Sequence, residues 1–600
     1  QPPVRLLDRD VDLLMRDVAS ALQGREPAAG SWWLADQGLR WVWIAMGDGL
    51  GPGASAAGAG RGLWPAIRDA AARLPRPQAI PGAKTFVRLD IAAGVSAVEQ
   101  VSFSGWRGLE LGEEGLAFER DTGVLFFPWD LVARGARTTN GLIQVATILR
   151  LIPDAAATAD LRRQMIRGRQ VPVRRFRVIS LFTDGLAAYP LTGGRPAARC
   201  LRAEEIEQSL RAAGEALLHC ARPDGSFRYL YDPVADRESD DYNLPRHAGT
   251  TWAVLDLYGL QRDERLLDAA RLALQNLLSY AKPFGRPSDD AICLVRQDKV
   301  KLGSAALAVL ALTRFQGLSG DRQFEKPCLQ LGRMLLLSQL PSGRFINLYR
   351  YSTSAADLGF ESMYYPGEAV LALARLHRLT GQAIWLEAAE RGARHLVEVR
   401  DAKVPLRELY HDHWLLMALD ELHELGAEGP WITGMRRLAA AILDDQNRDP
   451  DEPHRLGAFR GDSSVTPAAT RAEGLVAAYR MARRAGLQDA AQRIYGGLGL
   501  SAAYQRRMQY GAESVFGFAK PGEVLGAFPE SAGDPRIRID YLQHCVSALV
   551  GLRALMEAEK LEWAPELESE EAALLKQARE GLLTPEPRLE RRVPWLKPGP

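Results

Sequence analysis

The spacing of apolar residues along the chain changes near residue 200. Before that point, short apolar runs rich in β-branched and aromatic residues lie between Gly- and Pro-containing stretches, a pattern typical of β-strands. After it, apolar residues recur with helical spacing, and helical hairpins repeat roughly every 45 to 60 residues. The sequence therefore predicts an α+β domain over residues 1–200, an all-α domain over residues 201–560, and a C-terminal helix (Pro565–Gly581) with a Pro-rich tail over residues 561–600.

The first 200 residues contain both strand and helix patterns. The predicted strands are Leu39–Met46, Thr85–Ala92, Val124–Phe127 and Val173–Phe182. The predicted helices are Leu6–Leu22, Trp64–Arg73 and Asn140–Arg167. The Gly- and Ala-rich stretch Gly47–Gly62 is predicted to be a mobile loop, because glycine favours turns over regular structure. The change of pattern near Pro196 also predicts that a chain beginning there folds without the first domain.

Two kinds of helix alternate after residue 200. Six helices are apolar on nearly all sides, which predicts that they are buried inner helices. They are expected to begin near His247, Leu302, Tyr365, His411, Pro467 and Asp540. Each of the first five is followed by a short turn with Gly or Asp and then by a helix with a single apolar stripe, which is an outer helix.

These hairpins close into a ring if helix 203–221 is the outer partner of the last inner helix, 540–557. Six inner and six outer helices make an (α/α)6 toroid; an open solenoid is the rival, but its concave helices would not all need apolar surroundings. The outer-to-inner connections are long, and four contain a Gly-x-Phe beginning at Gly225, Gly343, Gly457 and Gly526. Functional residues gather on loops held by a rigid scaffold, so the working face is predicted where the inner helices begin.

Composition narrows the function. The chain has 75 basic and 74 acidic residues, a balance that argues against a nucleic-acid binder or a polybasic membrane binder. Its five cysteines are widely spaced without a Cys-x-x-Cys, which predicts free thiols rather than disulfides or a cysteine zinc site. A transmembrane segment is not expected, because the chain lacks a run of 18 apolar residues. Phosphate-loop and dinucleotide motifs are missing too, so no cofactor is predicted.

The chain begins Gln1-Pro2-Pro3 without methionine, which fits a mature exported protein and equally a shortened chain. Its richness in Ala, Arg and Gly is typical of a bacterium with a GC-rich genome. The expected location is therefore periplasmic or secreted, and otherwise cytoplasmic.

Polar and aromatic clusters stand at the predicted starts of the inner helices. Arg246 and His247 precede one helix, where they either cap it or bind substrate. The segment 361–368 places two carboxylates around two tyrosines, as in sugar sites where aromatic rings stack on the apolar face of a sugar. The segment 410–414 reads Tyr-His-Asp-His-Trp, and its two histidines diverge by about 200° on a helix. They do not match His-x-x-x-His zinc geometry, so no metal is predicted.

Two further clusters complete the set. Arg471 and Glu473 lie one turn inside an inner helix, where they form either a buried ion pair or part of a site. Asp540 and His544 share a helix face at i, i+4, where capping with a satisfied core histidine is the alternative to function. A closed ring would bring all these helix starts around one axis.

The helix start Tyr364-Tyr-Pro-Gly-Glu-Ala, the Gly-x-Phe connections and the Leu379-Thr-Gly turn resemble (α/α)6 carbohydrate-active proteins: glycoside hydrolases, polysaccharide lyases and sugar epimerases. The most similar are the helical domains of glucuronyl C-5 epimerases and unsaturated-uronyl hydrolases. The resemblance covers residues 201–560 and implies the fold and a poly- or oligosaccharide ligand, with uronic acids among the candidate sugars. No family's full catalytic motif maps onto this chain. Terpene and lanthionine cyclases share the fold, but their Asp-x-Asp-Asp element and Cys-Cys-His zinc ligands are missing.

In the first domain, the stretches Gly108–Gly112, Leu125–Val132 and Val173–Phe182 resemble the strands of AMMECR-type domains. That resemblance implies no chemistry. It leaves the first domain as a candidate contact for a protein partner.

Two classes of function stay open. The first is a polysaccharide-processing enzyme: a hydrolase would use Glu361 or Glu368 with Asp412 or Asp540, and we favour Glu361 as acid and Asp412 as base. A lyase or epimerase would use Tyr and His as acid and base at one carbon. The second is a non-catalytic glycan-binding component of a bacterial exopolysaccharide assembly or export system. The predicted catalytic candidates are Glu361, Asp412, His411, His413 and Asp540, and the predicted substrate-binding residues are Arg246, His247, Tyr364, Tyr365, Glu368, Tyr410, Trp414, Glu473 and His544.

Overall fold

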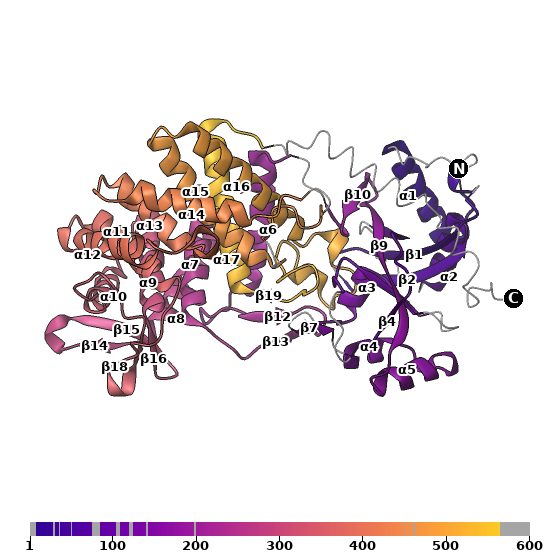
Figure 1. Cartoon of the computed structure of the whole chain (residues 1–600), viewed down its shortest axis with the longest axis horizontal. Helices are drawn as coiled ribbons and strands as arrows, with labels where there is room; N and C mark the ends of the chain where they lie inside the picture. Colours follow the sequence, from indigo (N-terminus) through magenta and orange to yellow (C-terminus); the bar gives the residue numbers. More distant parts are fainter. Residues whose placement is uncertain are drawn as a thin grey trace.

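The computed structural model separates a ring of helices from a sheet-containing part, which lie side by side in Figure 1. It describes residues 8–27, 31–34, 36–49, 51–74, 85–103, 109–118, 124–139, 142–143, 145–196, 200–449, 452–459 and 463–563. The predicted helix Pro565–Gly581 and the tail lie outside the described residues.

Six helices form the inner layer of the ring. They are α7 (Leu244–Gln261), α9 (Leu302–Ser319), α11 (Tyr365–Thr380), α13 (His413–Glu424), α15 (Val465–Arg484) and α17 (Ile539–Glu559). Each packs against the next in this order, and α17 packs against α7. That last contact closes the ring and excludes the open solenoid.

Six helices form the outer layer. They are α6 (Ala203–Cys220), α8 (Glu264–Leu278), α10 (Glu325–Leu337), α12 (Ala383–Arg394), α14 (Trp431–Asp445) and α16 (Gln488–Met508). Each of the last five packs on the inner helix that precedes it in sequence, and α6 packs on α17. The predicted (α/α)6 toroid and its inner-helix starts are therefore confirmed.

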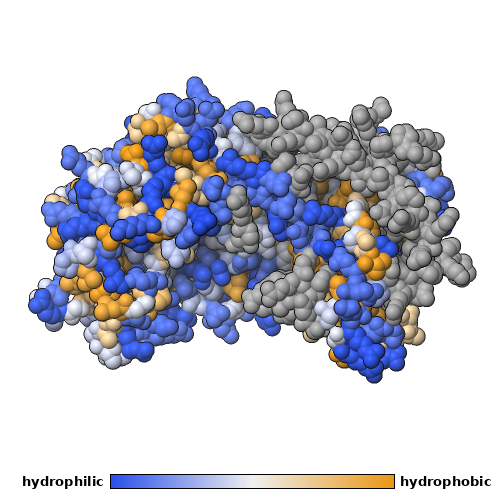
Figure 2. Space-filling model, in the orientation of Figure 1, coloured by the Kyte–Doolittle hydropathy of each residue, from blue (hydrophilic) through white to orange (hydrophobic). Residues whose placement is uncertain are grey.

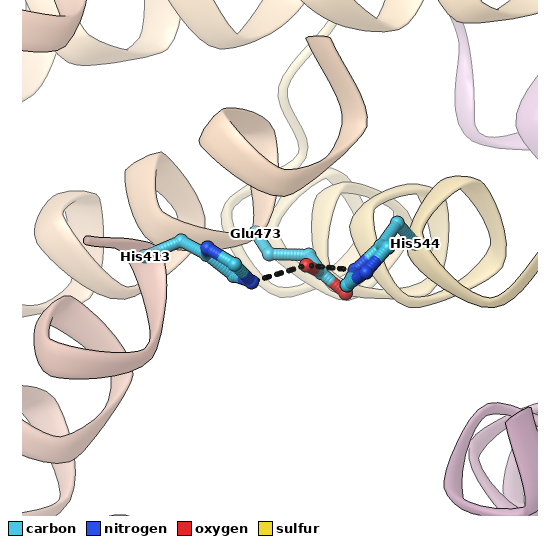
Figure 3. A group of neighbouring side chains, drawn as sticks. All are labelled: His413, Glu473 and His544. Carbon is cyan, nitrogen blue, oxygen red and sulfur yellow. Dashed lines mark hydrogen bonds and ion pairs between the residues drawn. The ribbon is translucent and has the colours of Figure 1, made fainter. Parts of the chain in front are cut away.

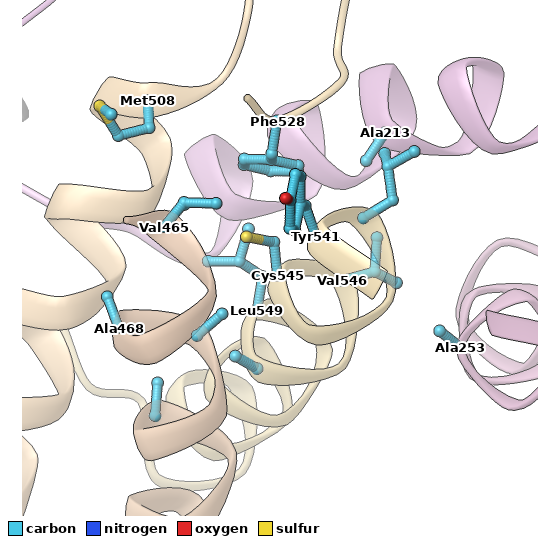
Figure 4. Packing of buried hydrophobic residues seen from close by; sticks show 14 of the residues in the cluster. Ala213, Ala253, Val465, Ala468, Met508, Phe528, Tyr541, Cys545, Val546 and Leu549 are labelled. Atoms are coloured by element: carbon cyan, nitrogen blue, oxygen red, sulfur yellow. The ribbon is translucent and has the colours of Figure 1, made fainter. Parts of the chain in front are cut away.

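The inner helices are apolar because both of their sides are covered. In α9 every residue from Leu302 to Leu312 is buried. Among the described residues, α9 is also the one helix long and apolar enough to cross a membrane by length and composition, and 67% of it is buried inside the protein. Figure 4 shows the same packing between α15, α17 and α6, where Cys545 lies among apolar side chains. All five cysteines are free thiols, as predicted.

The repeated Gly-x-Phe has one structural cause. Gly225, Gly343, Gly457 and Gly526 all have positive φ, between 78° and 87°. A Cβ at each would overlap a backbone carbonyl of an outer helix, in α8, α12, α16 and α6 respectively. The phenylalanine two residues later is buried in every copy. Glycine is thus required twice over, for the left-handed backbone and for the close approach to the helix.

We expect Gly343→Ala to lower the melting temperature more than Gly381→Ala does. Both glycines have positive φ, but a Cβ at Gly381 meets open space whereas one at Gly343 overlaps the carbonyl of Arg391. The backbone strain alone costs on the order of 1 kcal/mol, and the overlap adds to it. Thermal unfolding of the two variants measures the difference, and equal losses would contradict this explanation of the motif.

The long connections carry short strands beside the inner-helix starts. One sheet contains β12 (Leu230–Asp232), β13 (Arg237–Glu238) and β19 (Ile537–Arg538), and β19 runs directly into α17. A second contains β14 (Ala281–Phe284), β15 (Ala291–Arg296), β16 (Lys299–Lys301), β17 (Leu348–Arg350) and β18 (Ala355–Ala356). Because β16 runs directly into α9, the side chains of this hairpin lie at the rim of the predicted working face.

The first part of the chain is built on an antiparallel sheet in the order β11-β10-β9-β3-β1-β2, as its strand patterns predicted. These strands are β1 (Leu39–Gly47), β2 (Ala54–Arg61), β3 (Phe86–Ala93), β9 (Val171–Thr183), β10 (Ala188–Thr192) and β11 (Arg195–Pro196). The strands β4 (Glu99–Val101), β5 (Gly115–Phe118) and β6 (Leu125–Phe126) join it through β9, and β7 (Thr138–Thr139) pairs separately with β8 (Leu142–Ile143). The first part also has helices α1 (Asp8–Leu22), α2 (Leu63–Arg73), α3 (Pro128–Ala133), α4 (Val145–Leu151) and α5 (Ala159–Ile166).

Two sequence predictions in this part are corrected. Residues 54–61, predicted as loop, form β2, because Gly58 and Gly60 let α2 lie against the strand: a Cβ at Gly60 would be 2.7 Å from the backbone nitrogen of Ala66. The glycines therefore serve packing rather than flexibility. The single helix predicted over 140–167 is two helices, α4 and α5, separated by a segment that contains Pro153. Proline cannot continue the hydrogen bonding of a helix interior.

The sheet faces two apolar clusters. Along β1, Val42 and Ile44 belong to a cluster with α1 and α2, whereas Trp41 and Trp43 belong to the large cluster that continues into the ring. Contacts across this boundary include a hydrogen bond of 2.9 Å from Trp129 Nε1 to the carbonyl of Phe516 in the ring. Independent folding of the chain from Pro196 onward stays a prediction, and such a chain would expose this apolar boundary to water. On the face shown in Figure 2, most of the coloured surface is hydrophilic.

Candidate functional site

Three successive inner helices bring His413, Glu473 and His544 together (Figure 3). Glu473 Oε2 accepts a hydrogen bond from His544 Nδ1 at 2.9 Å, and it lies 3.5 Å from His413 Nε2. The last distance is too long for a well-formed hydrogen bond. We call these three residues the His–Glu–His cluster. The cluster unites three of the sequence motifs: the segment 410–414, the pair Arg471 and Glu473, and the pair Asp540 and His544. Each of these motifs stands at the start of its own inner helix.

His413 is the residue of the cluster with unused hydrogen-bonding capacity. It is 1% exposed, and neither ring nitrogen has a hydrogen-bond partner among the described residues. Burial lowers its pKa well below the usual range, and His544 and Arg471 act in the same direction. The imidazole is therefore neutral at pH 7. A buried polar group without a partner is costly, so one that persists at a helix start is a candidate for function.

The carboxylate of Glu473 is buried as well, which raises its pKa, while the neighbouring His544 opposes that rise. His544 keeps 12% of its side chain exposed. His544 thus links the buried Glu473 carboxylate to a side chain that solvent partly reaches. The arrangement can accept and return protons.

Two further carboxyl groups stand at the neighbouring starts of α11 and α13. Glu368, in the first turn of α11, is 4% exposed, and burial together with the nearby Asp412 raises its pKa well above the usual range. Its Oε2 has no hydrogen-bond partner among the described residues. Asp412 caps α13 by accepting from the backbone N–H of Leu415 at 3.0 Å and pairs with Arg400 at 2.9 Å. Burial nevertheless raises the pKa of Asp412 to about 6.

Aromatic residues surround the histidine. The Tyr364 ring packs edge-on to His413 with centroids 5.3 Å apart, and the Trp414 ring centroid lies 5.0 Å from that of His413. Trp414 is buried and packs against the imidazole. Tyr365 is half-buried on α11, and Tyr410 is 55% exposed before α13.

Arg471 joins His411 to the same region. Its Nε donates to His411 Nδ1 at 2.7 Å, and its guanidinium lies over the Phe459 ring of a Gly-x-Phe connection. Burial and Arg471 lower the pKa of His411 to about 4, so His411 is a neutral acceptor. It accepts the hydrogen bond from Arg471, and its predicted catalytic role stays a prediction.

Arg246 and Asp540 join the starts of α7 and α17. Arg246 Nε donates to Asp540 Oδ2 at 2.9 Å, and Arg538 Nη2 donates to the same oxygen at 3.0 Å. Asp540 is thus held between two guanidinium groups and is 4% exposed. Arg246 was predicted to bind substrate. It keeps 35% of its side chain exposed, but its guanidinium group is ion-paired with Asp540.

Two predicted site residues, His247 and Glu361, do not lie with the His–Glu–His cluster and its neighbours. His247 is fully buried and turned toward the outer layer, where Nε2 donates to the carbonyl of Ala273 at 2.8 Å and Nδ1 accepts from the Tyr242 hydroxyl at 2.6 Å. Burial lowers its pKa to about 4, so it is a satisfied core histidine. Glu361 keeps 57% of its side chain exposed on the loop before α11, ion-paired to Arg344 and accepting from Asn347 at 3.0 Å.

Sequence reasoning missed Arg400, which holds Asp412. Arg400 ends the segment that continues outer helix α12, where the sequence shows an ordinary charged face. It also missed Lys301 and Arg296 of the β15–β16 hairpin, which stand beside the start of α7. These two residues lie on a strand hairpin between an outer and an inner helix. Sequence reasoning looked for polar clusters at helix starts, so it did not find them.

The His–Glu–His cluster is also the group of described residues whose donor atoms could hold a metal ion, since they all lie within 4.8 Å of one another. Zinc accepts histidine and carboxylate ligands of this kind. The hydrogen bond between His544 and Glu473 accounts for the arrangement without an ion. The absence of a metal stays a prediction. A separate cavity of about 700 Å³ is lined by α14, α16 and the connection that follows α14.

No protein-family profile matches this sequence, and the curated proteins contain no significant match. Among solved structures, an α-1,6-mannanase of Salegentibacter is 11% identical with a TM-score of 0.44, covering 58% of this chain and 99% of its own. Cellobiose 2-epimerase of Spirochaeta thermophila is 14% identical with a TM-score of 0.44, covering 60% and 97%. A D-mannose isomerase is 11% identical with a TM-score of 0.45, covering 59% and 97%. At such identities the similarity concerns the fold and says nothing about substrate or reaction.

Proposed function

We propose that this chain is an enzyme that transfers protons on a carbohydrate bound where the inner helices begin, with His413 and His544 as the reacting groups and Glu473 as the residue that positions His544. The observation that carries the proposal is the His413 imidazole, which is buried, neutral and without a hydrogen-bond partner beside a carboxylate and a second imidazole.

The chemistry that suits this cluster is epimerisation or isomerisation of a reducing sugar. A base removes the proton from the carbon next to the carbonyl while an acid protonates the carbonyl oxygen, which gives an enediol. A proton then returns to carbon as the base takes one from a hydroxyl of the enediol, and the product is an epimer or a ketose. Both steps need an acid and a base positioned at adjacent atoms. His413 is the base in this proposal, and His544, oriented by its bond to Glu473, exchanges the second proton.

A carbohydrate ligand suits the residues around the cluster. Tyr364 presents an aromatic ring beside His413, and the more exposed Phe360 and Tyr410 lie on the connections that lead into α11 and α13. Aromatic rings stack on the apolar faces of sugars, and buried groups with unused hydrogen-bonding capacity, such as Glu368, suit their hydroxyls.

Glycoside hydrolysis is the second candidate, and Glu368 is the observation that favours it. A carboxyl group whose pKa is raised by burial and by a second carboxylate can serve as the general acid. This proposal replaces Glu361, which is exposed and ion-paired, as the acid. Asp412 remains the candidate base, although Arg400 and the α13 cap occupy its oxygens.

The experiment that separates these functions is incubation with reducing mono- and oligosaccharides in D₂O. Proton transfer predicts deuterium at the carbon next to the carbonyl, observed by NMR, together with a new epimer or ketose. Hydrolysis predicts new reducing ends without carbon-bound deuterium. Binding without either product would support the glycan-binding component instead. An exported location and a protein partner for the first domain stay proposals.

A further inference from the structure

A group of positive charges lies at the rim beside the starts of α7 and α9. The β15–β16 hairpin contributes Arg296, Lys299 and Lys301, and α7 contributes Arg246. We call these four residues the cation group. Arg296 Nη1 donates to the carbonyl of Tyr242 at 2.7 Å, which holds the hairpin against the connection that leads into α7.

A cavity of about 70 Å³ opens within this group. It is lined by Tyr242, Asn243, Leu244, Pro245, Arg296, Gln297, Lys299, Lys301 and Ser304. Three of these residues carry a positive charge, and none carries a negative charge. The volume exceeds what a single water molecule needs, so a small charged group fits.

The charge of Lys301 is not balanced by the protein. Its ammonium group has no hydrogen bond or ion pair among the described residues, although the side chain is half-buried. Burial lowers the pKa of Lys301, and Lys299, Arg246 and Arg296 all act in the same direction. Asp540, the acidic partner of Arg246, also pairs with Arg538. A half-buried cation among three others destabilises the folded protein unless an anion joins them.

Ser304 gives a second, independent indication of a ligand. It lines the cavity, is 2% exposed, and its hydroxyl has no hydrogen-bond partner in the described part of the chain. It lies in the first turn of α9, a helix without a side-chain cap, so the positive end of the helix dipole lies beside the same space. The Ser304 hydroxyl therefore lies in the same cavity as the Lys301 ammonium group, and an anion there would satisfy both.

The cavity borders the proposed reaction site. Gly303 follows Lys301 by two residues, and a Cβ there would overlap both Glu368 and Tyr365 of α11. Arg246 is also close enough to influence the pKa of the Tyr365 hydroxyl. A chain of sugars lying across the inner-helix starts could thus place one residue at His413 and a neighbouring one at the cavity.

We propose that this cavity binds the anionic group of an acidic carbohydrate, held by Lys301, Lys299, Arg296 and the Ser304 hydroxyl. The substrate class that follows is an oligosaccharide with a carboxylate or sulfate beside the reacting sugar, an inference that rests on the proposed function. A carboxylate and a sulfate are both small oxyanions, so both suit the cavity.

The test compares tetragalacturonate, a neutral tetrasaccharide and inorganic sulfate as ligands of the full chain by calorimetry. We expect tetragalacturonate to bind at least about tenfold more tightly than the neutral sugar, with affinity falling as salt rises. Lys301→Met should abolish that preference, and the matched variant Lys282→Met, on the neighbouring β14, should keep it. Strong competition by sulfate would indicate a sulfate ester, and weak competition a uronic acid.

The melting temperature distinguishes an anion-binding Lys301 from a Lys301 that only supports the fold. Lys301→Met should raise the melting temperature, because it removes an unbalanced charge, and sulfate should stabilise the wild type more than this variant at matched ionic strength. If Lys301→Met fails to fold, Ser304→Ala takes its place in the binding assay.

Equal binding of acidic and neutral sugars, or no binding of either, would overturn the anion site. Turnover of neutral sugars without acidic preference would overturn it while leaving the proposed function intact. Lys301-dependent binding without any turnover would keep the site and reject the function.

Discussion

Replacing Glu473 by glutamine is expected to lower turnover by about 10²- to 10⁴-fold while the ring stays folded. The carboxylate accepts from His544 Nδ1 and lies beside His413, so it fixes the tautomer and orientation of one imidazole and the local charge of both. Glutamine keeps the shape but cannot carry the negative charge that stabilises a protonated histidine. Because Glu473 acts through the histidines, the loss should appear in kcat rather than in KM, with a changed pH profile.

The matched control is Glu421→Gln. Glu421 is equally buried on an inner helix, but it lies near the opposite end of α13 and pairs with Arg375 at 2.9 Å and with Arg378. This variant should lose stability and keep turnover. Dialysis of the wild type against a chelator should leave turnover unchanged. Loss of activity that zinc restores would instead make the His–Glu–His cluster a metal site, and full activity of Glu473→Gln would reject its assigned role.

Replacing Arg400 by alanine is expected to destabilise the protein by about 3–5 kcal/mol near neutral pH, the usual effect of removing one partner from a buried ion pair. Arg400 pairs with Asp412, which is fully buried, and with Asp401, which is 6% exposed. Without the guanidinium, two buried carboxylates lose their counter-charge.

The loss should depend on pH in a defined direction. Burial raises the pKa of Asp412 from 3.8 to about 6, so the folded state binds this proton more tightly than the unfolded state does. Stability from this group is therefore highest at low pH and falls as pH rises from about 4 to 6. Removing Arg400 raises the folded pKa further and extends the fall to higher pH.

Denaturant unfolding at pH 5.5 and pH 8 measures this effect. Arg400→Ala should lose more stability at pH 8, and the double variant Arg400→Ala, Asp412→Asn should recover part of it. Arg407→Ala, which removes an exposed partner of Glu408, serves as the control and should change little. A loss of equal size at both pH values would show that Asp412 is not the group left uncompensated.

The sequence by itself determined the ring. Apolar surroundings on all sides of helices such as α9, glycine at the ends of α9 and α11, and the Gly-x-Phe repeats are local consequences of packing two layers of helices. Each signal is read from neighbouring residues, which is why the count of twelve helices and their starts could be predicted. The face that carries the polar clusters followed from the same reasoning.

Only the tertiary structure decided which polar residues meet. A helix start has several directions in which a side chain can point, and the ring turned His247 outward to Ala273 while it turned His413 toward Glu473 and His544. The partners that tune the site, Arg400 and Lys301, come from an outer helix and a strand hairpin whose sequences look like ordinary solvated faces. Burial and charge balance depend on which residues the fold brings together from distant parts of the chain. They therefore cannot be read from the residues next to each site in the sequence.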